Sequence, residues 1–209
     1  MVCGDYMLRS PPLTLKCRAK EIVVTALAAL WLPILLSAVF VFIVSSIIHM
    51  TPLWHKNDNP ALSNQDQVSM ALRSLAIPPG DYILPRAKDM KEMRSPEFKA
   101  KFKAGPVMFM TVLANPSMSM ARPLTLWFLY TLVTNFLVAC VASRALVPGA
   151  DREMVFSVVG MTAFIGYAST LWPMSIWYGR ALSLTIKSTI DGLIFAAVTA
   201  GTFVWLWPR

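Results

Sequence analysis

Lys187 and Asp191 are the residues of this sequence whose types and spacing most directly suggest chemistry. Because they are four positions apart, a helix would place both on one face. Ionisable groups inside a membrane segment mark ion or substrate pathways by default. However, a helix from Asp191 to Trp207 covers only about 24 Å of a roughly 30 Å hydrocarbon core, which favours an ion pair at the membrane interface. A polar pocket shared with Asn135, which lies in the middle of another apolar run, is the alternative.

His49 and His55 could ligate copper or haem at the membrane surface. Two residues six positions apart do not share a helix face, and no group of Asp, Glu or Cys residues beside them completes a metal shell. Methionines at 108–110 and 118–120 add sulfur, but methionine is common packing material. The sequence therefore predicts no metal ion and no other cofactor, and leaves the two histidines as weak candidates.

A basic segment with two aromatic rings lies near the middle of the chain. Its rings are four residues apart among three lysines, a pattern typical of a helix lying on anionic lipid. A solvated helix face explains the same residues equally well. The apolar runs elsewhere favour lipid over nucleic acid as the partner of the net charge of +8. The segment comprises Phe98, Lys99, Lys101, Phe102 and Lys103.

The composition is that of a membrane protein. Hydrophobic residues make up 56% of the 209 residues and charged residues 14%, whereas a soluble domain carries about 25% charged residues. The three cysteines are too few and too scattered for a disulfide framework. No phosphate-binding loop, nucleophile elbow or zinc-protease motif occurs, so the sequence does not indicate an enzyme.

Four apolar runs predict four transmembrane helices. The first, over 22–50, would span roughly 40 Å as a helix and is too long for the apolar core of a signal peptide, so we interpret it as an uncleaved anchor. The others cover 122–146, 154–179 and 183–208. The sequence thus predicts an all-α integral membrane protein with four transmembrane helices and a small α+β extramembrane insert between the first two.

The insert, 51–121, has several local signals. Ser63 and Asp66 match a capping box that opens an amphipathic helix. Pro96 at a first helical position and Gly105 at a C-cap delimit a second helix. A short strand is expected around Tyr82, and 107–113 reads either as its partner strand or as a re-entrant segment. The residues before the first helix, 1–21, form a basic tail.

Small residues in the last apolar run predict close helix packing. Gly192, Ala196 and Ala200 are spaced by four residues, as are Ala197 and Gly201. Such ridges let another helix approach closely, either within the chain or from another subunit.

Orientation follows from the basic residues that precede the first helix, which predict cytoplasmic N- and C-termini.

The chain resembles a group of uncharacterised bacterial multi-pass inner-membrane proteins with a small polar insert after the first helix. Three stretches carry this resemblance: PPGDYILP (78–85), KAGPVMFMTV (103–112) and WYGRALSLTIKSTIDGLIFAAVTAGTFVWLWP (177–208). The resemblance implies this topology and a bacterial inner membrane, and it implies no activity and no site.

For function, the sequence favours a non-catalytic accessory or structural subunit of a larger membrane complex, in contact with lipid and with other subunits or a second copy. The packing ridges, together with an insert too small to fold alone, carry this hypothesis. The alternatives are a small transporter or channel that uses Lys187, Asp191 and Asn135, and a metal or haem protein at His49 and His55.

Overall fold

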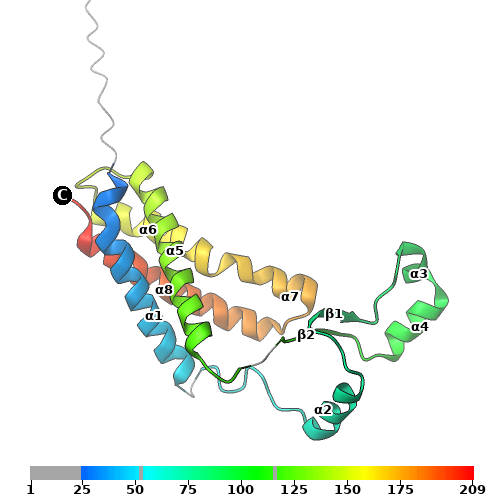
Figure 1. Cartoon of the computed structure of the whole chain (residues 1–209). Coiled ribbons are helices and arrows are strands. Elements are labelled where there is room, and N and C mark those ends of the chain that lie inside the picture. The colour runs from blue at the N-terminus through cyan, green and yellow to red at the C-terminus, as the bar shows by residue number, and fades with distance from the viewer. Residues whose placement is uncertain (1–24, 52–53, 115–116) are drawn as a thin grey trace, which may run out of the picture.

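The computed structural model describes residues 25–51, 54–114 and 117–209. Four helical segments in this part of the chain are long and apolar enough to cross a membrane. They are α1 (Trp31–Met50) with a preceding 3-10 turn (Leu27–Leu30), α5 (Ala121–Ala145), the segment Arg152–Tyr178, and α8 (Leu182–Leu206) (Figure 1). The predicted number of membrane-type helices is therefore confirmed, whereas the basic tail 1–21 and residues 22–24 lie outside the described residues.

The third of these segments is interrupted, unlike the single helix expected over 154–179. It consists of α6 (Arg152–Tyr167), a 3-10 turn (Ser169–Leu171) and α7 (Trp172–Tyr178). Pro173 has no N–H to continue an α-helical ladder, so α7 starts as a new helix with proline in its first turn. The break also brings Ala168 against α8, where a Cβ added to Gly192 would lie 2.6 Å from the Ala168 Cβ.

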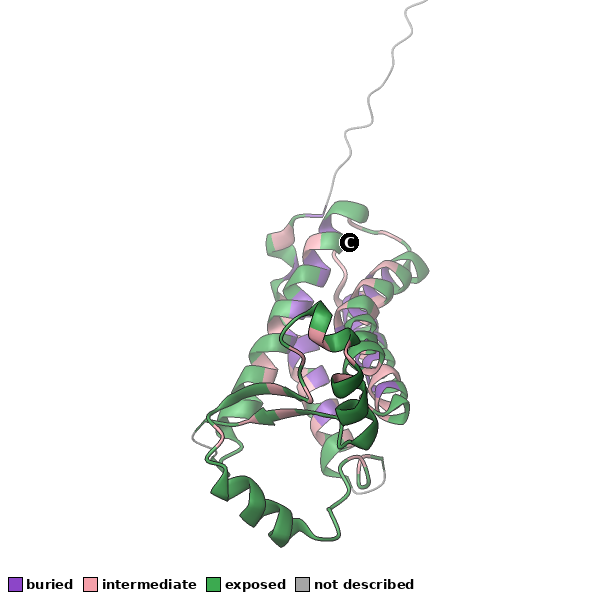
Figure 2. Ribbon diagram, turned by 90° about the vertical axis from the view of Figure 1, so that its right-hand side faces the viewer, coloured by how far each residue is buried: buried purple, intermediate pink, exposed green. Residues whose placement is uncertain are grey.

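Helix α8 lies centrally, against both α1 and α6, and α5 closes the bundle against α1 and α6. The buried residues lie in these helices, in the turns that join them and at Thr25 just before the first turn, and Figure 2 colours them purple. The first predicted ridge faces inward: Gly192, Ala196 and Ala200 are buried. Ala197 and Gly201 are exposed instead, and a Cβ on Gly201 would meet no atom within 4 Å.

The insert consists of α2 (Gln65–Ser74), β1 (Gly80–Leu84), α3 (Met90–Arg94), α4 (Pro96–Ala104) and β2 (Met108–Val112). The two strands pair antiparallel with Tyr82 opposite Met110, which confirms the strand alternative for 107–113. Helix α4 begins at Pro96 and has Gly105 as its C-cap, as expected, and the Ser95 side chain caps its N-terminus. The capping box at Ser63 is not formed, because α2 begins at Gln65 and its N-cap makes no side-chain hydrogen bond. No described residue between 54 and 114 is buried.

The two ends of the bundle differ. At one end, Thr25 binds the Leu146 carbonyl and the Gly149 N–H donates to Pro208, so the start of α1 and the C-terminus lie together (Figure 1). The insert leaves and re-enters the bundle at the opposite end, between α1 and α5. The candidate site lies at this second end.

Candidate metal centre

The chain that follows α1 folds back onto α8 and is held there by Lys187. The Lys187 Nζ donates to the Asp58 Oδ1 at 2.6 Å and to the Trp54 carbonyl at 2.8 Å. Its ammonium group also lies 5.9 Å from the centre of the Trp54 ring. Lys187 is therefore paired with Asp58 and not with Asp191, the partner that their spacing on the helix suggested.

His55 lies between two carboxylates. Its Nδ1 is 2.5 Å from Asp58 Oδ2, and its Nε2 is 3.1 Å from Asp191 Oδ2. In the neutral tautomer that donates from Nδ1 to the acceptor Asp58, the lone pair of the ring is on Nε2. Nε2 is buried and makes no hydrogen bond within the described residues, although it lies within ion-pair distance of the Asp191 Oδ2 when the ring is protonated.

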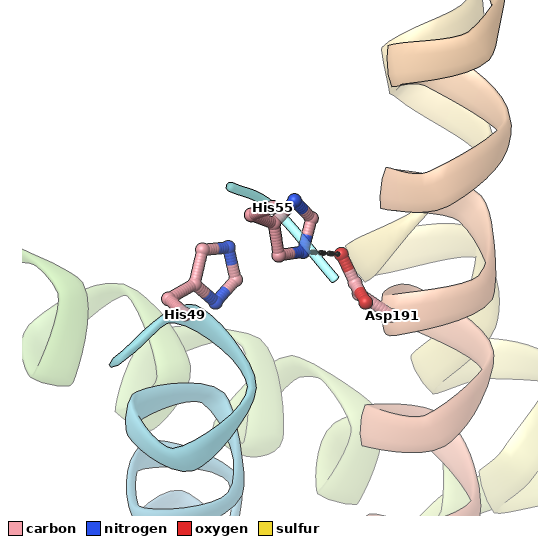
Figure 3. Close-up of side chains that lie close together, drawn as sticks. All are labelled: His49, His55 and Asp191. Atoms are coloured by element: carbon pink, nitrogen blue, oxygen red, sulfur yellow. Dashed lines mark ion pairs between the residues drawn. The ribbon is translucent and has the colours of Figure 1, made fainter. Parts of the chain in front are cut away.

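Asp191 is buried within the bundle end, with 4% of its surface exposed. Its Oδ1 accepts a hydrogen bond of 3.1 Å from the Trp54 Nε1, which fixes the plane of the carboxylate. The other oxygen, Oδ2, faces His55 (Figure 3). Asp191 thus presents one oxygen to the space beside the two histidines.

His49, in the last turn of α1, is the third member. Its Nδ1 lies 2.9 Å from the Ser45 carbonyl, an acceptor, so the lone pair of this ring is also on Nε2. Ser45 is itself held by α5, because the Trp127 Nε1 donates to its hydroxyl at 2.7 Å. The His49 ring stacks on His55, with centroids 4.5 Å apart and planes 7° from parallel.

The three side chains therefore converge. One ligand atom of each of His49, His55 and Asp191 lies within 4.8 Å of the other two (Figure 3). A metal ion prefers to lie in the plane of each imidazole that binds it, and two parallel stacked rings do not share such a point. Binding to both rings therefore requires one to tilt, and the exposed His49 is free to do so, whereas His55 is fixed by Asp58.

The charges around this group are unequal. The pKa of Asp58 is lowered, first by the hydrogen bond from Lys187 and then by the one from His55, so Asp58 is ionised at neutral pH. Lys187 compensates that charge. Among the described residues, Asp191 has no cationic partner except His55 when protonated. A bound cation would therefore meet a carboxylate whose charge is otherwise unbalanced.

Asn135 does not belong to this group. It is fully buried, donates to the Thr131 carbonyl at 2.8 Å and to the Tyr167 hydroxyl at 3.1 Å, and accepts a 3.1 Å bond from Thr199. Thr199 follows Asp191 by about two turns of α8, roughly 12 Å. We call these four residues the Asn135 cluster, and we call the group around His55 (His49, Trp54, His55, Asp58, Lys187, Asp191) the His55 cluster. The three residues of the channel hypothesis are thus divided between two clusters.

The basic segment is also remote from the His55 cluster. Its residues belong to α4, in the part of the insert that extends from the bundle (Figure 1). A groove of about 620 Å³ lies between this segment and the end of β1. It is lined by Phe98, Lys99, Phe102 and Lys103, but not by Lys101.

Sequence reasoning missed Trp54 and Asp58 as site residues and separated Asp191 from the histidines. The argument from helix faces does not apply to His49 and His55, because α1 ends at Met50 between them. A local signal for the contact between His55 and Asp58 was present in the sequence, since the two residues are three positions apart in a polar turn.

Comparison with known proteins identifies no relative of this chain: neither known protein-family models, nor curated proteins, nor solved structures yield a match.

Proposed function

We propose that this protein is an integral membrane protein that binds a divalent transition-metal ion through His49, His55 and Asp191. One observation carries the proposal: each of the three side chains has its other polar atom bonded to a second partner. These partners are the Ser45 carbonyl, the Asp58 carboxylate and the Trp54 indole. Histidines that ligate metals usually donate their second N–H to a carboxylate or a backbone carbonyl in this way.

The donor set narrows the class of metal. Two imidazole nitrogens and one carboxylate oxygen suit zinc and iron(II), whereas calcium and magnesium prefer oxygen ligands only. Three protein ligands also leave coordination positions open for water or another small ligand. Structural zinc sites normally use four protein ligands, so the set favours a centre that binds or exchanges a ligand.

Haem fits the arrangement less well than a single ion. A haem held by two histidines lies between their rings, whereas His49 and His55 stack directly on each other at 4.5 Å. The stacking leaves no gap for a porphyrin between them. Of the two cofactors considered for these histidines, the arrangement therefore supports a metal ion.

Metal analysis of the purified full chain tests the proposal. After treatment with a chelator and dialysis in mild detergent, we expect the protein to bind one zinc ion per chain in a calorimetric titration. His55→Ala should abolish this binding, because the His55 Nε2 is buried, makes no hydrogen bond and lies 3.1 Å from the Asp191 Oδ2. His49→Ala should weaken it less, since the His49 ring must first tilt.

The matched control is Lys56→Ala, which changes the adjacent exposed residue outside the cluster. It should bind zinc like the natural chain. The metal centre is disproved if the natural chain binds no zinc, iron(II) or copper(II). It is equally disproved if His55→Ala binds metal as tightly as the natural chain.

The insert supports a second proposal, that the protein is an accessory subunit that docks on a partner. None of its described residues is buried, and α2 exposes Val68, Met70 and Leu72. A segment with so little core of its own gains stability by burying such side chains against a neighbour. Purification in mild detergent tests this: a lone monomer with no co-purifying subunit contradicts it.

We also propose that the chain lies in a bacterial inner membrane with both termini in the cytoplasm. The support for this orientation is that the C-terminus lies at the same end of the bundle as the start of α1, which the basic residues precede in the sequence. The insert and the His55 cluster would then face the extracytoplasmic side. Labelling of single added cysteines at the C-terminus and in α2 in intact cells tests this orientation.

A further inference from the structure

A cleft of about 730 Å³ lies between the β1–β2 hairpin of the insert and α7, away from the metal ligands. We propose that it binds the headgroup of an anionic phospholipid of the surrounding bilayer, with Arg86 and Arg180 holding the phosphate. This inference goes beyond the proposed metal centre and shares no residue with it. The residues that carry it are Asp81, Arg86, Phe109, Met174, Tyr178 and Arg180.

The position of α7 places the cleft at the level of lipid headgroups. Tyr178 is the last residue of the third membrane-type segment, and Arg180 lies in the turn that leads to α8. The rings of Trp177 and Tyr178 are exposed by 75% and 52% at this point, which is typical of aromatic residues at a membrane–water boundary. One wall of the cleft therefore belongs to the membrane interface and the other to the insert.

The charges of the cleft favour an anion. Among the residues that the structure describes, neither Arg86 nor Arg180 forms an ion pair. The backbone N–H of Arg180 donates to the Met174 carbonyl, whereas its guanidinium group makes a single long hydrogen bond of 3.4 Å, to Ser188, within the described residues. The one carboxylate in the cleft, Asp81, accepts a hydrogen bond from Thr111 across the hairpin at 2.5 Å and is partly satisfied there. Two guanidinium groups from separate elements thus remain available for a phosphate, which they bind well.

The apolar side of the cleft fits the rest of a lipid. Phe109 packs edge-to-face on Tyr178 with ring centroids 5.5 Å apart, and this contact joins the hairpin to α7. Ile83 and Arg86 also line the groove beneath α4, where Lys99 and Lys103 add two more cations. A phospholipid provides both a phosphate for the arginines and apolar chains for Met174 and the aromatic pair, whereas a soluble anion provides only the first.

Native mass spectrometry of the full chain in detergent tests the proposal, with dioleoyl phosphatidylglycerol and dioleoyl phosphatidylcholine as probes. Two basic residues at an anionic surface predict a preference of roughly thirtyfold for phosphatidylglycerol. The double variant Arg86→Gln/Arg180→Gln should reduce this preference to about twofold or less. The variant Arg86→Lys/Arg180→Lys, which keeps both charges, should retain most of it.

The matched control is Arg73→Gln/Lys88→Gln, which removes two exposed charges of the insert outside the cleft. It should keep the full preference, and every variant should bind zinc like the natural chain, which separates this test from that of the metal centre. The proposal is overturned by equal binding of the two lipids to the natural chain, or by an unchanged preference in Arg86→Gln/Arg180→Gln. Displacement of the lipid by excess sn-glycerol 3-phosphate would also overturn it, because the ligand would then be a soluble anion.

Discussion

Two polar clusters interrupt the apolar bundle, and they differ in how their hydrogen-bonding groups are satisfied. The Asn135 cluster is composed of neutral groups: the Asn135 amide and carbonyl both have partners, on Thr131, Tyr167 and Thr199. The His55 cluster contains charged groups and a buried imidazole nitrogen without a hydrogen bond. A neutral, satisfied network fixes how helices pack, whereas a charged network with free lone pairs can bind something.

Their positions reinforce the difference. The Asn135 cluster joins α5, α6 and α8 in the bundle interior, where all of its members derive from membrane-type helices. The His55 cluster joins α1 and α8 to the loop at the insert end, where the His49 and Trp54 side chains are exposed. The same helix, α8, thus contributes Thr199 to the Asn135 cluster and Asp191 to the proposed metal centre.

After the complete loss of zinc binding expected for His55→Ala, the largest expected effect is that of Asp191→Asn on metal binding. The variant keeps an oxygen that can accept from Trp54 but loses the charge that attracts a cation. We expect the zinc affinity to fall by at least about 100-fold, more than the loss of an outer partner usually causes. Competition with a fluorescent chelator measures it. Asp66→Asn, in the exposed first turn of α2, is the control, and equal affinities in the two variants would show that Asp191 is not a ligand.

The next largest effect on zinc affinity is expected from a change of Asp58. In our proposal this residue does not bind the metal ion but orients His55. Asp58→Asn should lower the zinc affinity by roughly 10- to 100-fold, because an amide holds the His55 Nδ1–H less strongly than a carboxylate. Lys187→Gln removes the ion pair between Lys187 and Asp58 but leaves the contact between Asp58 and His55. Its effect on zinc affinity should therefore be smaller than that of Asp58→Asn. Equal losses in the two variants would mean that Asp58 acts only by holding the loop on α8.

A third prediction concerns the packing that positions Asp191. Gly192→Ala would place a Cβ within 2.6 Å of the Ala168 Cβ, so α8 must shift, and we expect the free energy of unfolding to fall by about 1–3 kcal/mol. Gly201→Ala meets no neighbour and should be neutral or stabilise the helix by up to about 1 kcal/mol. Thermal unfolding in detergent compares the pair. Similar melting temperatures would indicate that Ala168 yields easily.

The sequence allowed the membrane-type helices and the hairpin to be predicted, because each depends on local periodicity or turn chemistry. Pro96 and Gly105 delimit α4 for the same reason. The helix α3 was missed although its signal is local: Asp89 accepts from the Glu92 N–H, and the Glu92 carboxylate accepts from the Lys88 N–H. The break at Ala168 was missed because a proline inside an apolar run permits a helix to continue as well as to restart.

The candidate site could be predicted in its residue types but not in its grouping. Lys187, Asp191 and the two histidines stood out because they are polar groups at the ends of apolar runs. Their mutual positions depend on how the loop after α1 folds back across 137 positions of sequence, from Trp54 to Asp191. Periodicity carries no information on such a contact, so each residue was assigned a neighbour on its own segment, and Lys187 was paired with Asp191.

The smallest effect is expected from Asn135→Ala, and it sharpens the distinction between the clusters. Removing the amide leaves the Tyr167 and Thr199 hydroxyls with fewer partners, and bonds of this kind in membrane proteins contribute about 0.6 kcal/mol each. We therefore expect a decrease in stability of about 1 kcal/mol and an unchanged zinc affinity. Asn64→Ala, at an N-cap without a side-chain bond, should change neither quantity.

The informative result would be a change of zinc affinity in Asn135→Ala. Thr199 and Asp191 lie on one rigid helix. If α8 rotates because Thr199 has lost its hydrogen bond to Asn135, Asp191 also turns relative to His55. A loss of affinity without a loss of zinc stoichiometry would then mean that the Asn135 cluster sets the rotation of α8. In that case the interior cluster would be a positioning element of the metal centre, and the separation of packing from binding along α8 would be wrong.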